Sequence, residues 1–209
     1  MSEPEWLAWA RELQAIAQTG LAFAANPYDR DRYQLLRTLS ARMVAARTTL
    51  SLDALESLFD ADSGYATPKI DVRGAVFDDR GRLLMVRERS DADRWTLPGG
   101  WAEVNLTPAE NVIKEVREES GFLVRVQKLA AAWDRTRQGH PAALFSCCKL
   151  FFLCDVAGGT AAIGPETSEV GWFPEERIPD NLSCDRVLPR QIRRLFQHAR
   201  DPALPTDFE

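Results

Sequence analysis

The sequence is poor in the side chains that build zinc and thiolate centres. Its 209 residues include two histidines and four cysteines, and no pair among them has the spacing of a zinc site. A catalytic metal would therefore have to be held by oxygen ligands, which favours Mg²⁺ or Mn²⁺. The cysteines are interpreted as reduced thiols rather than as a disulfide framework.

Long apolar runs and an excess of positive charge are also lacking. No apolar run approaches the ~20 residues that cross a bilayer, and the start, Met-Ser-Glu-Pro-Glu-Trp, has neither a basic stretch nor an apolar signal core. We therefore expect a cytoplasmic protein with no membrane partner. Lys and Arg total 26 against 31 Asp and Glu, a net charge of −5. This acidity argues against a protein that coats nucleic acid, but a small phosphorylated substrate bound through a divalent cation remains compatible.

The pattern of apolar residues divides the chain into two predicted domains. Residues 1–66 are expected to form an all-helical N-terminal domain of three helices, the second after Asp29 and the third capped by Ser51. The first helix should bury a face made of Trp6, Trp9, Leu13 and Ile16.

Residues 67–209 are expected to form a second domain. Strands are predicted at 70–77, 83–86, 124–133, 149–155 and 170–173, and helices at 108–120 and 187–198. This order predicts an α+β fold, with a mixed sheet packed between helices.

The helix predicted at 108–120 has clear signals at both ends. Thr107 is a predicted N-cap, Pro108 fits the first helical position, and Glu110 completes a capping box. Gly121 is suited to end the helix. A stripe that faces the core is then expected from Ala109, Val112, Ile113 and Val116.

Three glutamates share another face of this helix. Glu115, Glu118 and Glu119 are spaced i, i+3 and i+4, so they lie about one turn apart. Carboxylates so close repel one another, and a divalent cation is the simplest compensating charge, because Mg²⁺ prefers carboxylate oxygens and completes its shell with substrate phosphates. A solvated acidic face is the alternative. The preceding Pro-Gly-Gly loop, whose backbone can approach a ligand closely, favours the metal.

This segment resembles the Nudix box, the signature of the Nudix hydrolases. The matching positions are Gly100, Glu115, Val116, Glu118, Glu119, Gly121 and Phe122. Two positions depart from the family pattern: Leu106 stands where the family usually has Glu, and Lys114 where it usually has Arg. In the family these two side chains tend to pair with each other, so their joint replacement is coherent and leaves the three glutamates intact.

Flanking residues extend the resemblance over about residues 67–200. They include Trp95–Gly100 before the box and Glu169–Phe173 after it. Weaker similarity to a bacterial branch with a helical N-terminal extension, which includes CDP-choline pyrophosphatases and ADP-ribose pyrophosphatases, is found at Pro27–Tyr33, Asp134-Arg135, His140-Pro141 and Lys149–Cys154. The resemblance implies a Nudix α/β/α sandwich.

The resemblance also implies an activity and a set of site residues. Nudix enzymes hydrolyse a nucleoside diphosphate linked to a group X into a nucleoside monophosphate and X-phosphate, here with CDP-choline or ADP-ribose as the expected substrate. The cofactor would be Mg²⁺, for which Mn²⁺ can substitute. The expected ligands and general-base candidates are Glu115, Glu118 and Glu119, with the Gly99 carbonyl as a further ligand and Glu166 and Glu169 as further base candidates.

Candidate substrate contacts are Arg73, Arg87, Trp101 and His140. Each of them has a structural alternative: a surface role for the arginines, aromatic packing for Trp101 and a structural role for His140. Glu169 could likewise be an ordinary surface residue.

The sequence is also compatible with other functions. A nucleotide-binding regulatory module without catalysis would also fit the departures at Leu106 and Lys114, and RNA ends or nucleoside triphosphates are further possible substrates. Trp6 and Trp9 near the chain start need burial, which leads us to expect a homodimer through the N-terminal helices.

Overall fold

The computed structural model describes residues 3–209, which group into two compact units. One unit comprises the chain up to Pro68 together with Ala142–Ser146, and the other comprises Lys69–Pro141 and Cys147–Glu209. No helix among the described residues is long and apolar enough to cross a membrane.

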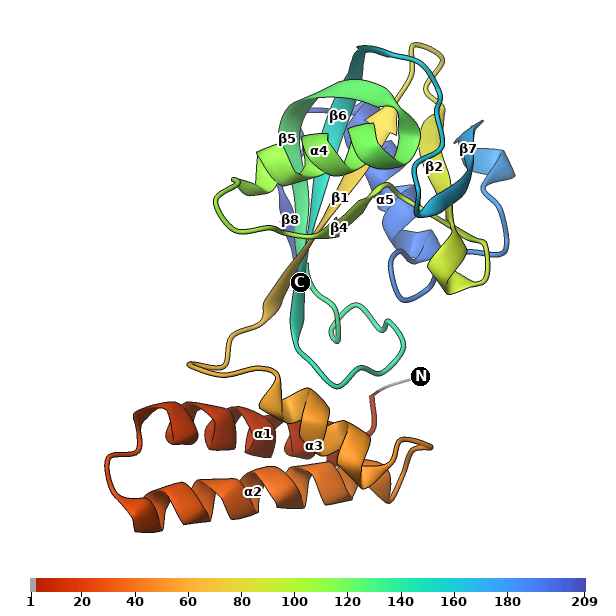
Figure 1. Ribbon diagram of the computed structural model, residues 1–209. Coiled ribbons are helices and arrows are strands. Elements are labelled where there is room, and N and C mark those ends of the chain that lie inside the picture. Colours follow the sequence, from red (N-terminus) through yellow and green to blue (C-terminus); the bar gives the residue numbers. More distant parts are fainter. Residues whose placement is uncertain (1–2) are drawn as a thin grey trace. The chain divides into compact units, whose positions relative to one another are not determined.

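The first unit contains three helices, as predicted: α1 (Glu5–Phe23), α2 (Pro27–Ala45) and α3 (Leu52–Asp60) (Figure 1). Each of the last two begins at a side-chain cap. The Asn26 side chain accepts the Asp29 backbone N–H at 2.8 Å, and the Ser51 hydroxyl accepts that of Ala54 at 3.2 Å. These caps satisfy amide groups that have no partner within the helix.

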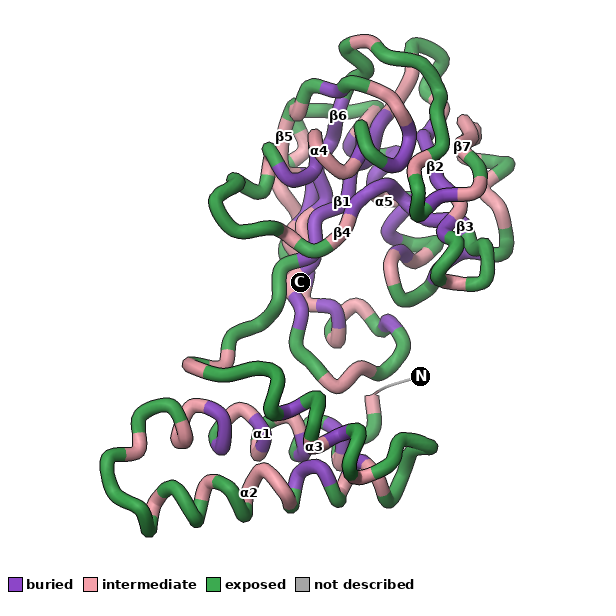
Figure 2. Tube along the Cα trace, in the orientation of Figure 1, coloured by how far each residue is buried: buried purple, intermediate pink, exposed green. Residues whose placement is uncertain are grey.

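The buried face of α1 matches the predicted one only in part: Trp6 packs against the core of the unit, but two other predicted members do not. Trp9 and Ile16 are 55% and 47% exposed, whereas Leu7 and Ala10 face the core. The remaining members of this core are Ala41 and Val44 of α2 and Leu55 and Phe59 of α3. The two long helices approach closely: the Ser40 hydroxyl donates to the Ala10 carbonyl at 2.8 Å. Small side chains permit this contact, and Trp9 and Ile16 stay exposed. Figure 2 shows buried, intermediate and exposed residues alternating along the helices of this unit.

A short segment from the middle of the chain belongs to this helical unit. Arg11 donates to the Ala143 carbonyl at 2.8 Å, and Leu144 packs against the helical core. This segment connects two long strands, β5 (Phe122–Asp134) and β6 (Cys147–Gly159).

The second unit is built on a mixed sheet with strand order β3-β2-β1-β6-β5-β8. β4 pairs with β1, and β7 pairs with β2. β1 and β6 run parallel, whereas β1–β2 and β5–β6 are antiparallel. The remaining strands are β1 (Lys69–Phe77), β2 (Leu83–Glu88), β3 (Arg94–Thr96), β4 (Gly99–Trp101), β7 (Thr167–Phe173) and β8 (Asp207–Phe208). The predicted sheet is confirmed, and the three strands missed, β3, β4 and β8, are two or three residues long.

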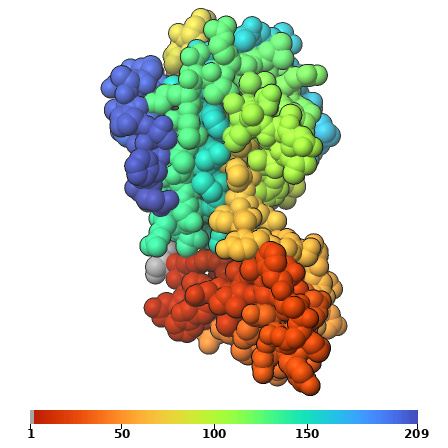
Figure 3. Space-filling model, turned by 90° about the vertical axis from the view of Figure 1, so that its left-hand side faces the viewer, coloured from red at the N-terminus to blue at the C-terminus, as the bar shows by residue number. Residues whose placement is uncertain are grey.

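Two helices cover opposite faces of this sheet. Val112 and Val116 of α4 (Pro108–Ser120) pack on one core, and Ile192 and Leu195 of α5 (Pro189–Arg200) pack on the other. Seen from the β5 side, α4 and the C-terminal segment lie on either side of the strands (Figure 3). The predicted Nudix sandwich preceded by a helical region is confirmed.

The capping box at the start of α4 should contribute measurably to stability. The Thr107 hydroxyl accepts the Glu110 N–H at 3.2 Å, and the Glu110 carboxylate accepts the Thr107 N–H at 2.8 Å. Thr107→Ala removes the first bond and should lower the free energy of unfolding by about 1 kcal/mol. Urea denaturation should detect this loss, with Thr160→Ala, an exposed threonine of the same unit, as the control. Equal losses in both variants would contradict a capping role.

Candidate active site

Helix α4 lies unusually close to the sheet because of one glycine. A Cβ added to Gly74 in β1 would come within 2.7 Å of the Val116 Cγ2 atom, closer than carbon atoms pack. Val112 and Val116 therefore rest directly on the β1 backbone, and the last turn of α4 reaches the loop between β3 and β4. This packing brings the glutamates of the helix to the glycines that precede it.

The loop at Leu97–Gly100 is fixed by backbone contacts. The Pro98 carbonyl accepts the Gly74 N–H at 2.8 Å, and the Leu97 carbonyl accepts an Arg73 N–H at 3.2 Å. Gly99 has φ +145°, and a Cβ there would lie 2.0 Å from the Val72 carbonyl oxygen. Only glycine fits this close approach.

Glu119 points into this loop from α4. Its Oε2 accepts the Gly99 N–H at 2.9 Å, and the residue is only 6% exposed. Burial raises the pKa of Glu119 to about 8, with further upward contributions from Glu115 and Glu88, although the Arg73 charge and the Gly99 N–H oppose the shift. A carboxylate so poorly solvated is stabilised in its charged form by a nearby cation.

Three glutamates from different segments converge here. Glu88 at the end of β2, Glu119 of α4 and Glu166 before β7 each offer a carboxylate oxygen, and these oxygens lie within 4.8 Å of one another. Opposite ligands of a single Mg²⁺ are separated by about 4.2 Å, so the group needs little adjustment to hold one ion. The all-oxygen donors, two of them on buried residues, fit a hard divalent cation.

The Glu166 loop is held in place from both sides. The Glu166 carbonyl accepts the Arg89 N–H at 2.9 Å, and the neighbouring Thr167 hydroxyl donates to the Glu119 carbonyl at 2.9 Å. A Cβ on Gly164 would meet the Glu118 carbonyl oxygen at 2.2 Å, so the loop lies directly against the last turn of α4. Glu166 is thus exposed but well positioned.

The other two box glutamates occupy different environments. Glu115 is half-buried with its carboxylate against Gly100, and burial raises its pKa. Glu118 is exposed, and its nearest cation is Lys114 at 3.6 Å. The three glutamates of the predicted face therefore differ in solvent exposure, from the buried Glu119 through the half-buried Glu115 to the exposed Glu118.

Lys114 has a partner that the sequence did not indicate. Its Nζ lies 2.6 Å from the Glu103 carboxylate, and the Asn111 side chain bonds the same loop, accepting the Glu103 N–H at 2.8 Å and donating to the Leu106 carbonyl at 3.3 Å. The loop before α4 is therefore tied to the helix without a charged side chain at 106.

Arg73 is not a surface arginine, so that alternative is wrong. It is 4% exposed and paired with Asp71 at 2.7 Å, and the fully buried Lys149 binds the same carboxylate at 2.7 Å. Burial alone would raise the pKa of Asp71, but the two cations hold it below its usual value. Burial lowers the pKa of Lys149, against the opposing charge of Asp71.

Glu169 and Trp101 are exposed, and Arg87 is half-buried. The Arg87 guanidinium lies 3.3 Å from the Glu169 carboxylate and donates to the Asp93 carbonyl at 2.7 Å. Glu169 is therefore engaged in an ion pair and is not one of the three converging carboxylates. Trp101, at the end of β4, is 48% exposed.

His140 is buried between two fixed partners. Its Nδ1 donates to the Cys184 carbonyl at 2.7 Å, and its Nε2 lies 3.1 Å from the Gln191 side-chain nitrogen, which donates to it. The orientation of Gln191 follows from its oxygen, which accepts the Leu188 N–H at 2.9 Å. Burial, joined by the charges of Lys149 and Arg135, lowers the pKa of His140 to about 4.

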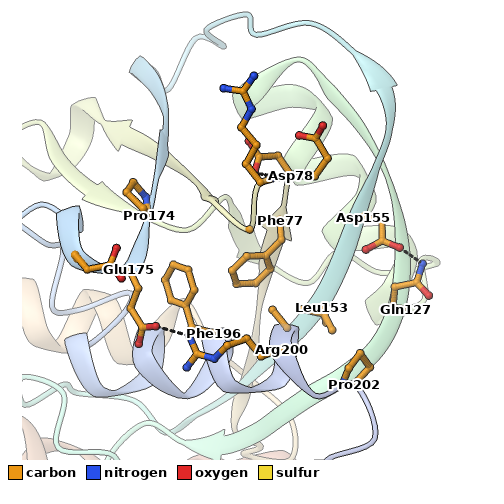
Figure 4. A pocket seen from close by; sticks show the side chains of 15 residues that line it. Phe77, Asp78, Gln127, Leu153, Asp155, Pro174, Glu175, Phe196, Arg200 and Pro202 are labelled. Atoms are coloured by element: carbon orange, nitrogen blue, oxygen red, sulfur yellow. Dashed lines mark hydrogen bonds and ion pairs between the residues drawn. The ribbon is translucent and has the colours of Figure 1, made fainter.

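A hollow of about 640 Å³ lies elsewhere, beside the β1–β2 turn (Figure 4). Phe77, Leu153 and Phe196 line it, and its charged rim includes Glu175, which pairs with Arg200 at 2.5 Å. None of the converging glutamates borders this hollow, so it is separate from the candidate active site.

Family comparisons agree with the geometry. A family model described as "UDP-X-like, N-terminal oligomerisation domain" matches residues 4–59, and the NUDIX domain model matches residues 67–194. The chain belongs to the Nudix family and is a Nudix hydrolase.

Individual relatives are similar over long stretches. A Bacillus subtilis (strain 168) protein named "Putative ADP-ribose pyrophosphatase YjhB" is 42% identical over 99% of this chain and 98% of its own length. A crystal structure of a UDP-X diphosphatase is 31% identical with a TM-score of 0.62 and full coverage of both chains. An ADP-ribose pyrophosphatase structure from Streptococcus suis 89-1591 is 32% identical with a TM-score of 0.61, covering 68% of this chain and 100% of that one.

The depressed pKa of His140 predicts a stability loss in acid. The unfolded histidine binds a proton near pH 6.5 and the folded one only near pH 4, so lowering the pH between these values favours unfolding. This group should remove about 2 kcal/mol of stability between pH 7 and pH 5. Urea denaturation at both pH values should show a smaller loss for His140→Gln, which keeps an amide donor. Equal losses in wild type and variant would refute the neutral, structural role.

Proposed function

We propose that the protein is a Mg²⁺-dependent pyrophosphohydrolase that cleaves a nucleoside diphosphate linked to a group X into a nucleoside monophosphate and X-phosphate. The observation that carries the proposal is the convergence of Glu88, Glu119 and Glu166 within 4.8 Å, beside the Gly99 loop. A non-catalytic nucleotide-binding module would not require buried carboxylates in this arrangement.

The ion would be held by the box glutamates, chiefly Glu119 and Glu115, with Glu118 and the Gly99 carbonyl as further ligands. Mg²⁺ bound there would neutralise the diphosphate and make a bound water more acidic. The Gly99 N–H fixes the Glu119 side chain at 2.9 Å, and Arg73 fixes the loop through the Leu97 carbonyl at 3.2 Å. Preorganised charges of this kind reduce the reorganisation needed during reaction.

Glu166 is the general base that we favour among the candidates. Its carboxylate faces the other converging glutamates, whereas Glu169 is paired with Arg87 at 3.3 Å. Glu118 is already opposed by Lys114 at 3.6 Å. An exposed, positioned carboxylate next to the metal ligands can accept the proton of the attacking water.

The substrate class follows from both the chemistry and the relatives. The names of similar proteins refer to ADP-ribose and to UDP-X, and CDP-choline is the third candidate that the sequence raised. The half-buried Arg87 and the exposed Trp101 are proposed to contact the substrate. Arg73 and His140 are buried with protein partners, so we propose that they act by holding the loop and the β5–β6 region rather than by touching substrate.

We further propose that the helical unit makes a homodimer. Trp9, Ile16 and Phe23 are spaced by seven residues on α1, and all three are exposed. An unburied apolar stripe of this length is typical of an interaction surface. Tyr28, Leu35 and Leu39 form a similar exposed set on α2, and the matching family model is described as an oligomerisation domain.

Hydrolysis should be tested with Mg²⁺ and a panel of ADP-ribose, UDP-sugars, CDP-choline, NADH and nucleoside triphosphates, with products separated by chromatography. Glu119→Gln should lower kcat at least ~100-fold, because it removes a charged ligand, and Glu166→Gln should cause a comparable loss. Glu169→Gln should retain activity within about threefold. Nucleotide binding without cleavage of any compound would instead identify a regulatory module. A strong loss of activity in Glu169→Gln alone would show that Glu169, and not Glu166, is the general base.

The oligomer prediction can be checked by light scattering over a range of concentrations. The wild type should have the mass of a dimer, whereas Trp9→Glu combined with Phe23→Glu should be monomeric, because two charges would be placed in the buried interface. Tyr65→Glu changes an exposed aromatic residue outside the helices and should stay dimeric. A monomeric wild type at every concentration would refute the proposal.

A further inference from the structure

Glu88 is a buried carboxylate outside the Nudix box. It is the last residue of β2, is 3% exposed, and pairs in register with Arg94 of β3 and Thr167 of β7. Neighbouring strands therefore leave its side chain little freedom to turn to solvent. Its carboxylate instead lies within 4.8 Å of those of Glu119 and Glu166.

The charge of Glu88 is only partly compensated by the protein. The Ser90 hydroxyl donates to Oε1 at 2.7 Å, and the nearest guanidinium, that of Arg186, is 3.8 Å away. Arg186 is shared: it also lies 3.3 Å from Asp91. A buried carboxylate with one hydroxyl donor and a distant, divided cation is poorly stabilised, and two further carboxylates nearby make its position less favourable still.

We propose that Glu88 is a direct ligand of the catalytic metal, acting together with Glu119 and lying beside the proposed general base Glu166. The inference deepens the proposed function and rests on it. The end of β2 then contributes a carboxylate to the metal site, as do helix α4 and the loop before β7. The cation supplies the charge that Ser90 and Arg186 leave missing.

A structural alternative makes a different prediction. If Glu88 served only to anchor Arg186 and Ser90, removal of its charge would affect folding but leave the metal affinity unchanged. If Glu88 is a ligand, Glu88→Gln keeps the side-chain shape and an acceptor for Ser90 but weakens metal binding. The same change relieves repulsion among the three carboxylates, so the metal-free variant should be at least as stable as the wild type.

The test is a Mn²⁺ titration of the full chain, read by the electron paramagnetic resonance signal of free Mn²⁺. Glu88→Gln should weaken binding about tenfold or more, the range seen when residues around metal centres are changed. Glu175→Gln, which alters a carboxylate paired with Arg200 beside the hollow of Figure 4, is the matched control and should bind like the wild type. Circular dichroism with a chelator present confirms that each variant is folded.

The outcomes separate the two proposals. If the wild type fails to bind Mn²⁺, the metal-dependent function falls and this inference falls with it. If the wild type binds and folded Glu88→Gln binds within twofold of it, only the role of Glu88 is overturned. If Glu88→Gln does not fold, Arg186→Gln is measured instead, because this change removes the cation that competes with the metal for the Glu88 carboxylate. Tighter Mn²⁺ binding in Arg186→Gln supports Glu88 as a ligand, and unchanged or weaker binding overturns that role.

Discussion

The hydrogen bond from the Gly99 N–H to the Glu119 carboxylate is the contact on which the site depends. It joins the end of α4 to the loop between β3 and β4 at 2.9 Å, and it forms only because two glycines permit a close approach. Gly74 lets the helix settle on β1, and Gly99 lets the loop pass the Val72 carbonyl. A side chain at either position would separate the carboxylate from its amide.

The buried charges near this contact do not cancel: two cations face a single aspartate. Asp71 engages both Arg73 and Lys149 at 2.7 Å, so one buried positive charge is left to act on Glu115 and Glu119. That charge opposes the upward pKa shift of Glu119 but does not cancel it, and the pKa remains near 8. Glu119 is therefore largely protonated at neutral pH until a cation binds, and binding of a divalent cation would release this proton and restore the charged carboxylate.

The sequence was sufficient for features that depend on near neighbours. The Thr107 cap, the Gly121 stop with φ +78° and the stripe of Val112 and Val116 all follow from residues within a few turns. It was insufficient for contacts made by strand register. Glu88 meets the site because β2 pairs with β7 and places it opposite Thr167, and no local pattern marks it. Trp9 and Ile16 were wrongly assigned to the buried face of α1, because bulky residues suggest a core, whereas the close contact at Ala10 and Ser40 needs small ones.

The departures at Leu106 and Lys114 can be understood from the loop that precedes α4. Lys114 bonds Glu103 at 2.6 Å, and the buried Asn111 fastens the backbone at Glu103 and Leu106. The charged contact between this loop and the helix is thus made by Glu103, three positions before Leu106. Leu106 needs no charge in this arrangement, and Lys114 needs only one acceptor rather than the paired geometry that suits Arg. The altered box therefore preserves the constraint that matters for chemistry, the placement of Gly99 against Glu119, and gives no structural reason to regard the domain as inactive.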